Sequence, residues 1–90
     1  MPQEIHIAGI VIHARAAELR AIRSYLALLP GAQVHAVSDE GKLVATLETD
    51  STKRTVDYMD AIRALRGVLN VALVYQHAEP SSALDEEVET

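Results

Sequence analysis

The sequence predicts a single α+β domain whose elements follow one another in the order β-α-β-β-α-β. Three observations predict it. A chain of 90 residues is long enough for one modest core and too short for two. Segment 5–14 is β-branched and nearly continuously apolar, and segment 69–77 has the pattern of a last strand. Between them, two stretches with helical spacing enclose a short hairpin pattern.

The first segments predict a strand followed by a helix. Segment 5–14 is β-branched and has no helical period, which is typical of a central strand. In segment 15–29 apolar residues recur every three or four positions, which predicts an amphipathic helix. Its expected buried residues are Leu19, Ile22, Leu26 and Leu29. Pro30-Gly31 ends this helix, because glycine readily adopts a positive φ.

The middle of the chain predicts a hairpin. Segment 33–38 alternates weakly, as expected for a short edge strand, and segment 43–49 is the returning strand. Between them Asp39-Glu40-Gly41-Lys42 is a turn signal, since Gly41 supplies the positive φ that a tight turn needs.

A second helix and a last strand follow the hairpin. Asp50, Ser51 and Thr52 are all suitable N-caps for this helix, which runs to about Arg66 and ends at Gly67. Its expected buried residues are Val56, Met59, Ile62 and Leu65. Segment 69–77 is the last strand.

This order of elements predicts a ferredoxin-like split βαβ fold. Two right-handed β-α-β units joined by a hairpin form a four-stranded antiparallel sheet with both helices on one face. The expected strand order is 4-1-3-2, with the first and third strands in the centre. Residues 1–78 form the predicted domain. Residues 79–90 form an acidic tail that we expect to be disordered.

One face of such a sheet carries no helix. Because side chains alternate along a strand, assigning Ala8 and Ile10 to the helix side sends their neighbours to the open face. The same alternation places Tyr75 toward the helices and Gln76 away from them. The expected binding residues on the open face are Ile7, Gly9, Val11, His13, Val44, Thr46, Glu48, Ala72 and Val74.

The centre of this predicted face is apolar, and exposed apolar patches usually mark interfaces. The two helices contain seven basic and three acidic residues, whereas the strands and turns up to His77 contain one basic and five acidic residues. A partner on the sheet is therefore expected to be apolar with cationic groups. The alternative is that the face pairs with a second copy of the chain.

The sequence argues against catalysis and against bound metals or cofactors. It has no cysteine, and its four glycines are isolated rather than gathered in a phosphate-binding loop. Its histidines lack metal-ligand spacing, and His6 and His13 fall on opposite faces of one strand. We expect all four at the surface: His6, His13, His35 and His77.

The charge and the apolar runs exclude two classes of partner. A net charge of −5, with no aromatic residue on the two central strands, argues against binding of nucleic acid. No apolar run is long enough to span a membrane, and the first residues lack a basic secretory start. We therefore expect a cytoplasmic, non-enzymatic binding domain without stable membrane association.

Several segments together resemble the NapD family of chaperones, over roughly residues 5–79, and an acidic tail follows them. They are Gly9-Ile10-Val11-Ile12, Leu29-Pro30-Gly31, Glu40-Gly41-Lys42-Leu43-Val44 with Glu48, and Gly67-Val68-Leu69 leading to Leu73-Val74-Tyr75. Ala45 and Thr46 are less bulky than the aliphatic residues expected there.

The resemblance implies a ferredoxin-like chaperone of twin-arginine export. Such a protein binds the signal peptide of the periplasmic nitrate reductase catalytic subunit in the cytoplasm. It delays export until the molybdenum cofactor and iron–sulfur cluster are inserted. The resemblance implies that the peptide lies as a helix on the open sheet face. Glu48, and Asp39 or Glu40, would then meet its arginines.

Two other functions share the predicted topology. One is an ACT-like regulatory or dimerisation domain that binds a small ligand, and the other is a subunit that scaffolds a larger assembly. We expect the chain to be a monomer or a weak dimer. A tight dimer without affinity for a signal peptide would favour the ACT-like function.

Overall fold

The computed structural model describes residues 4–80, and the six predicted elements are present in the predicted order. Their bounds are β1 Glu4–Ala14, α1 Leu19–Leu28, β2 Ala32–Ser38, β3 Lys42–Thr49, α2 Thr52–Arg63 and β4 Val68–Pro80. A short 3₁₀ turn, η1 (Ala16–Glu18), leads from β1 into α1. The last strand ends at Pro80 rather than at His77. The predicted tail beyond residue 80 lies outside the described residues.

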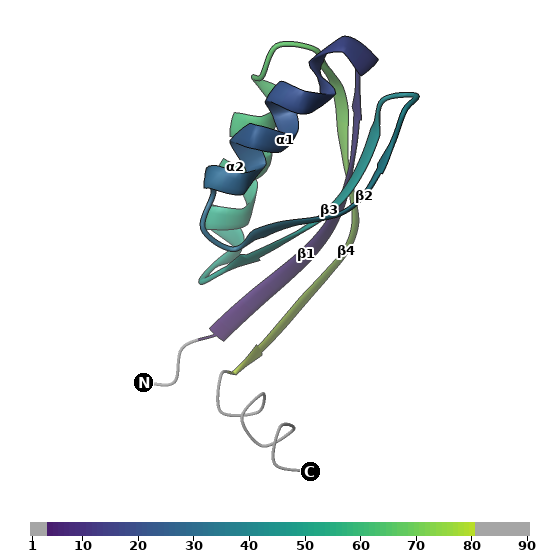
Figure 1. Ribbon diagram of the computed structural model, residues 1–90. Coiled ribbons are helices and arrows are strands. Elements are labelled where there is room, and N and C mark those ends of the chain that lie inside the picture. The colour runs from purple at the N-terminus through teal and green to yellow at the C-terminus, as the bar shows by residue number, and fades with distance from the viewer. Residues whose placement is uncertain (1–3, 81–90) are drawn as a thin grey trace.

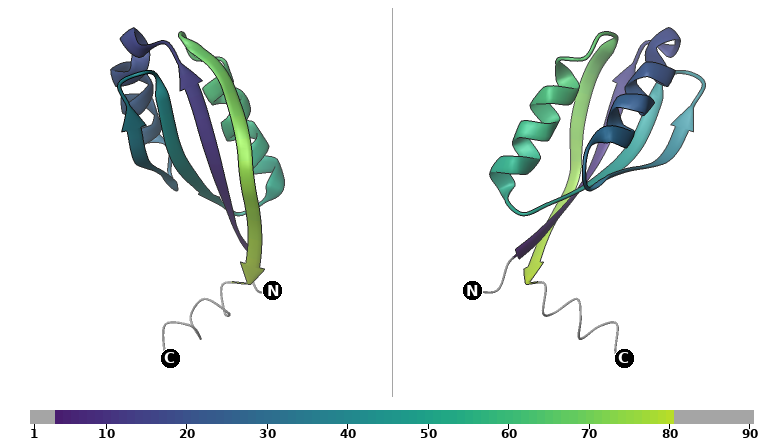
Figure 2. Two further views of the ribbon diagram at one scale, coloured as in Figure 1. Left: turned by 90° about the vertical axis from the view of Figure 1, so that its right-hand side faces the viewer. Right: turned by 60° about the vertical axis from the view of Figure 1, so that its left-hand side comes forward.

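The four strands form one antiparallel sheet in the order β2-β3-β1-β4, and both helices lie on the same side of it (Figures 1 and 2). This confirms the predicted ferredoxin-like split βαβ fold with β1 and β3 in the centre. The left view of Figure 2 looks onto the strands with the helices behind them. One whole face of the sheet is therefore left without a helix.

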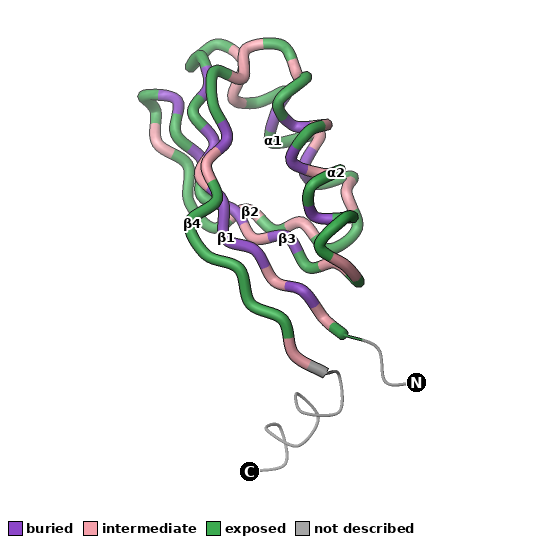
Figure 3. The backbone as a smooth tube through the Cα atoms, turned by 180° about the vertical axis from the view of Figure 1, so that it is seen from behind, coloured by how far each residue is buried: buried purple, intermediate pink, exposed green. Residues whose placement is uncertain are grey.

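The core lies between the sheet and the two helices (Figure 3). Ile10, Ile12 and Leu47 are fully buried on the central strands, and Ile22 and Leu26 of α1 pack against them. These residues follow the predicted alternation in the strands and the predicted spacing of three or four in α1. Leu19 and Leu29 are partly buried at the margin of this core.

Val56 of α2 was predicted to be buried, but it is 47% exposed. The helix therefore turns a slightly different face to the sheet at this position. Thr55 takes the buried position beside Met59 and Ile62. Its Oγ1 lies 2.7 Å from Oγ1 of Thr49 and 3.2 Å from the carbonyl oxygen of Ser51. A threonine can be buried here because its hydroxyl keeps hydrogen-bond partners.

The pairing of β4 with β1 contains a β-bulge that the sequence did not predict. Gly9 pairs with Tyr75, whereas the next residue, Ile10, pairs with Leu73, so Val74 is an extra residue in β4. From Tyr75 onward, each side chain of β4 therefore points to the side opposite to the one that simple alternation predicts. Tyr75 lies on the open face over Gly9, and Gln76 points to the helix side, where its Nε2 donates to Oγ1 of Thr52 at 3.3 Å. The predicted orientations of Tyr75 and Gln76 are both wrong.

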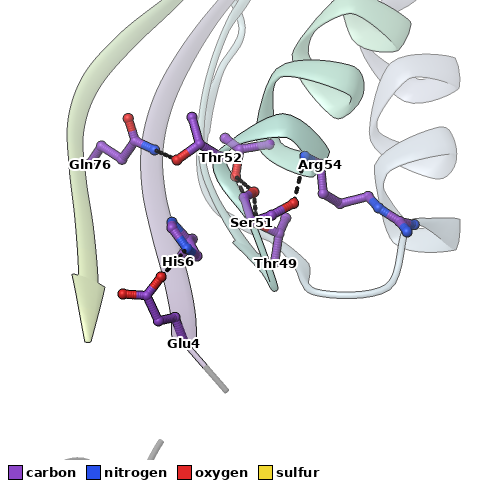
Figure 4. A network of polar contacts seen from close by, with 8 residues as sticks. Glu4, His6, Thr49, Ser51, Thr52, Arg54 and Gln76 are labelled. Atoms are coloured by element: carbon purple, nitrogen blue, oxygen red, sulfur yellow. Dashed lines mark hydrogen bonds and ion pairs between the residues drawn. The ribbon is translucent and has the colours of Figure 1, made fainter. Parts of the chain in front are cut away.

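The prediction of surface histidines is wrong for His6, which is only 8% exposed. His6 shares the helix-side face of β1 with Ala8, opposite to His13, as the odd separation predicted. Its Nε2 lies 3.4 Å from Oε1 of Glu4 (Figure 4). Its buried Nδ1 has no hydrogen-bond partner among residues 4–80.

Candidate binding face

The pairing register sorts the outward residues of the three strands β3, β1 and β4 into rows, because directly opposed residues of antiparallel strands point to the same side. Starting near the beginning of β1, the rows are Glu48–Ile7–His77, Thr46–Gly9–Tyr75, Val44–Val11–Ala72 and Lys42–His13–Asn70. We call this surface the open face. The register places eight of the nine predicted binding residues in these rows, and Val74 lies beside them at the bulge.

The first row forms the acidic end of the open face, and the last row carries basic side chains. Glu48 is exposed in the first row and takes part in no ion pair within residues 4–80. Glu79 lies on the neighbouring edge strand, where its Oε1 is 3.1 Å from Nε2 of His77. At the other end the last row carries Lys42 and His13. Glu48 is therefore the one carboxylate that the four rows offer to a cationic group.

The hairpin acids lie far from this acidic end. Asp39 and Glu40 occupy the turn just before Lys42, whereas Glu48 is six residues further along β3. At about 3.3 Å per residue, that separation is about 20 Å. Glu48 and the hairpin acids therefore cannot contact the same pair of adjacent arginines, and Glu48 is the better-placed candidate.

A hollow of about 380 Å³ lies in the middle of the open face. Its lining includes Gly9, Val44, Thr46, Val74 and Tyr75. The Tyr75 ring rests against the backbone at Gly9, where an added Cβ would come within 2.6 Å of Cδ1 and 2.8 Å of Cζ. Glycine at this position thus lets an aromatic ring lie across the neighbouring strand.

The rim of the hollow toward β2 is polar. His35 is the extra residue of a bulge in the β2–β3 pairing, between Val34 and Ala36, and its side chain reaches across to β3. Its Nε2 lies 2.8 Å from Oγ1 of Thr46. Each of these two groups therefore has a partner within the protein.

Hydrogen bonds hold the acidic end of the sheet to α2 (Figure 4). The hydroxyl of Thr49, the residue after Glu48, donates to the carbonyl oxygen of Ser51 at 2.9 Å. Ser51 caps α2, with its Oγ accepting from the backbone N–H of Arg54 at 3.1 Å. The backbone N–H of Glu48 donates to the carbonyl oxygen of Gly31 at 2.8 Å. The backbone that presents Glu48 is therefore fixed on both sides.

Sequence reasoning missed Tyr75 and did not assign His35 firmly to the face. The signal that could have located the ring is Gly9 itself. A glycine inside a strand often marks the close approach of another group, and Tyr75 is the only tyrosine in the predicted strands.

Two further observations concern metal ligands and helices among the described residues. Within the described range 4–80, no group of three or more histidine or acidic side chains is arranged to hold a metal ion. None of the helices in that range is long and apolar enough to cross a membrane. The groups that the open face offers are apolar side chains, hydrogen-bonding groups and a carboxylate at one end.

Comparisons with known proteins agree on one family. The model of the family described as NapD protein matches residues 5–80. The Chaperone NapD of Escherichia coli K12 is 31% identical over 75 residues, covering 81% of this chain and 85% of the relative. The Chaperone NapD of Haemophilus influenzae is 23% identical over 75 residues, covering 82% and 81%.

Solved structures give the same fold. The solution structure of the E. coli Tat proofreading chaperone protein NapD matches with a TM-score of 0.76 and 25% identity, covering 83% of this chain and 80% of that one. A transcriptional regulatory protein of the AsnC family from Pyrococcus furiosus matches with a TM-score of 0.63 and 19% identity, covering 83% and 49%. The second likeness concerns the fold alone.

Proposed function

This chain belongs to the NapD family of chaperones, and we propose that it binds the twin-arginine signal peptide of the periplasmic nitrate reductase catalytic subunit. Binding takes place in the cytoplasm, on the open face, and delays export until the enzyme's cofactors are inserted. The proposal assigns this chain no catalytic step.

The observation that carries the proposal is an apolar sheet face with a free carboxylate at one end. Val11 and Val44 form its middle, with Val44 38% exposed, and Glu48 stands in the first row without an ion-pair partner among the described residues. A twin-arginine signal peptide has the complementary chemistry, a basic start followed by an apolar segment. Laying the apolar side of a helix into an apolar groove is a common mode of peptide recognition.

The dimensions of the face suit a short helix. The rows of Glu48 and Val44 are four residues apart along β3, which is about 13 Å at 3.3 Å per residue. A peptide helix rises about 1.5 Å per residue, so about nine residues span this distance. Arginines at one end of such a segment reach Glu48 while the following apolar side chains cover Val11 and Val44.

The test is isothermal titration of the full chain with a synthetic twin-arginine signal peptide from its host's nitrate reductase. The same peptide with both arginines replaced by alanine is titrated beside it. We expect measurable binding that weakens for the altered peptide. Failure of the protein to bind the native peptide would overturn the proposal, and so would equal affinity for both peptides.

Glu48→Arg tests the acidic end, and Glu40→Arg is its matched control. Exposed ion pairs contribute about 0.2–1 kcal/mol, and charge reversal replaces this attraction with a repulsion of similar size. A loss of about 1–2 kcal/mol is a loss of about 5–30-fold in affinity. We expect this loss for Glu48→Arg and a much smaller one for Glu40→Arg, which makes the same charge change at the far end of β3. Equal effects would remove Glu48 as a specific contact.

Val11→Asp tests the apolar middle of the face. Val11 is only partly buried, so the fold should tolerate the carboxylate, which circular dichroism can verify. The carboxylate would be desolvated under an apolar helix without a partner, so we expect binding to be lost. Unchanged binding by a folded Val11→Asp protein would place the peptide elsewhere.

A further inference from the structure

The bulge in β4 gives the open face two consecutive outward side chains. In a regular strand Val74 and Tyr75 would point to opposite sides, but the extra residue brings both to the wall of the central hollow. The residue before them, Leu73, pairs with Ile10, whose side chain faces the helices. The change of face thus occurs within three residues.

Both of these residues are largely exposed. Tyr75 is 50% exposed and Val74 63%, and Val44 across the hollow is 38% exposed. The ring can lie against β1 at Gly9 only because this residue has no side chain. An aromatic ring held in this way loses little freedom when it is covered, which favours it as an anchor for a ligand.

Two polar groups at the rim of the hollow, on His35 and Thr46, are already paired with each other. The contact of 2.8 Å between Nε2 of His35 and Oγ1 of Thr46 gives each group a partner. A polar side chain entering the hollow would lose water and would find neither of these two groups free to bind it. An apolar side chain has no hydrogen bonds to water to lose, and it covers the exposed ring and the valines.

We propose that the hollow between Tyr75, Val74 and Val44 is a subsite for one large apolar side chain of the bound peptide, aliphatic or aromatic. This inference rests on the proposed function, because the peptide helix supplies the side chain. The row of Gly9 and Tyr75 lies two residues along the strands from the row of Glu48, about 7 Å. The side chain therefore belongs to a residue about four positions after the arginine that meets Glu48.

The experiment titrates the full chain and three variants with the native signal peptide. Tyr75→Ala removes the wall of the subsite, Tyr75→Phe keeps the ring, and Leu73→Ala is the matched control. Leu73 is 47% exposed on the same strand but pairs with Ile10 rather than lining the hollow. We expect about tenfold weaker binding for Tyr75→Ala, as for a buried aromatic anchor, and affinity close to wild type for the other two.

A second set of titrations locates the side chain in the peptide. Each apolar residue of the peptide is replaced by alanine and titrated against the wild type and Tyr75→Ala. One replacement should weaken binding to the wild type and have little further effect on Tyr75→Ala, because the two changes remove the same contact. The coupled position should lie about one helical turn after the arginines.

The outcomes separate this inference from the proposed function. If the wild type binds the native peptide and Tyr75→Ala binds it equally well, the subsite is overturned and the chaperone function stands. Equal losses for Tyr75→Ala and Leu73→Ala, or the absence of any coupled peptide position, would also overturn the subsite. If the wild type does not bind the native peptide, the proposed function fails and the occupant of the hollow fails with it.

Discussion

The contact between Tyr75 and Gly9 predicts that a small substitution will change stability in opposite directions in two backgrounds. Gly9→Ala adds a Cβ that would lie 2.6–2.8 Å from ring carbons Cδ1 and Cζ of Tyr75. The neighbouring atoms belong to a side chain rather than to the backbone, so the strand can stay in place while the ring swings away. In the Tyr75→Ala background there is no ring to displace.

The magnitude follows from the exposed fraction of the ring. An aromatic side chain buries about 150–250 Å² in a core, so a half-exposed one buries about 100 Å². At about 25 cal/mol per Å², the buried half contributes about 2.5 kcal/mol. The displaced ring keeps part of this, so Gly9→Ala should lower the free energy of unfolding by about 1–2 kcal/mol. Without the ring, the same change should raise it by about 0.5 kcal/mol, because glycine weakens a strand interior.

Urea denaturation of the wild type, both single variants and the double variant measures this coupling. The expected interaction energy is about 2 kcal/mol, well above the roughly 0.5 kcal/mol within which independent sites are additive. If Gly9→Ala costs the same free energy with and without Tyr75, the ring does not rest on Gly9, and the reasoning about the hollow is refuted.

Three further substitutions test the parts of the fold that support the open face, and urea denaturation measures the effect of each. His6→Leu should raise the free energy of unfolding by about 1 kcal/mol, because it removes a buried nitrogen without a partner among residues 4–80; a clear loss would reveal a partner for it. Gly31→Ala should lower it by about 2 kcal/mol or more. Its φ is 84°, and a Cβ would overlap the carbonyl oxygen of Glu48, so a neutral result would contradict this turn geometry. Ser51→Ala should lower it by about 1 kcal/mol through loss of the cap to Arg54, and no change would mean that the cap contributes nothing.

The fold was predictable because the signals that specify it are local. Alternation in segment 5–14 grouped Ile10 and Ile12 on one face, which we assigned to the helices, and both are fully buried. Spacing of three and four identified Ile22 and Leu26 in the same way. The four-stranded order then followed from handedness and from the number of elements.

The errors at Val56 and His6 have a different origin. Thr55 is buried in place of Val56 because Thr49 and Ser51 offer its hydroxyl partners, and these partners are brought together only by the fold. His6 is buried on the helix side of β1, where it pairs in register with Thr49 of β3 and Ala78 of β4. Residue type alone indicated the opposite in both cases, because buried polar groups depend on partners that a single sequence does not reveal.

For the residues of the open face, the predictions succeeded where strand pairing is regular and failed where it is interrupted. The pairing of β1 with β3 is regular, so alternation correctly placed Val11, Val44 and Glu48 on the open face. The pairing of β1 with β4 is interrupted, and there alternation failed by one residue, which sent Tyr75 to the wrong side.

A bulge leaves no mark in the alternation of a strand that is apolar on both faces, as the segment from Val71 to Tyr75 is. The sequence signal for the bulge lies instead in the neighbouring strand β1, where Gly9 leaves room for the ring of Tyr75. Bulges occur preferentially at sheet edges and beside functional sites, where they turn a side chain to a new direction, and β4 is an edge strand. The bulge at Val74, which defeated the prediction for Tyr75, is thus the same feature that brings an exposed aromatic ring onto a face whose other apolar side chains are aliphatic. For other chains of this fold, a glycine in the first strand opposite an aromatic residue in the last is therefore better evidence for the outward residues of that edge than the alternation of the edge strand itself.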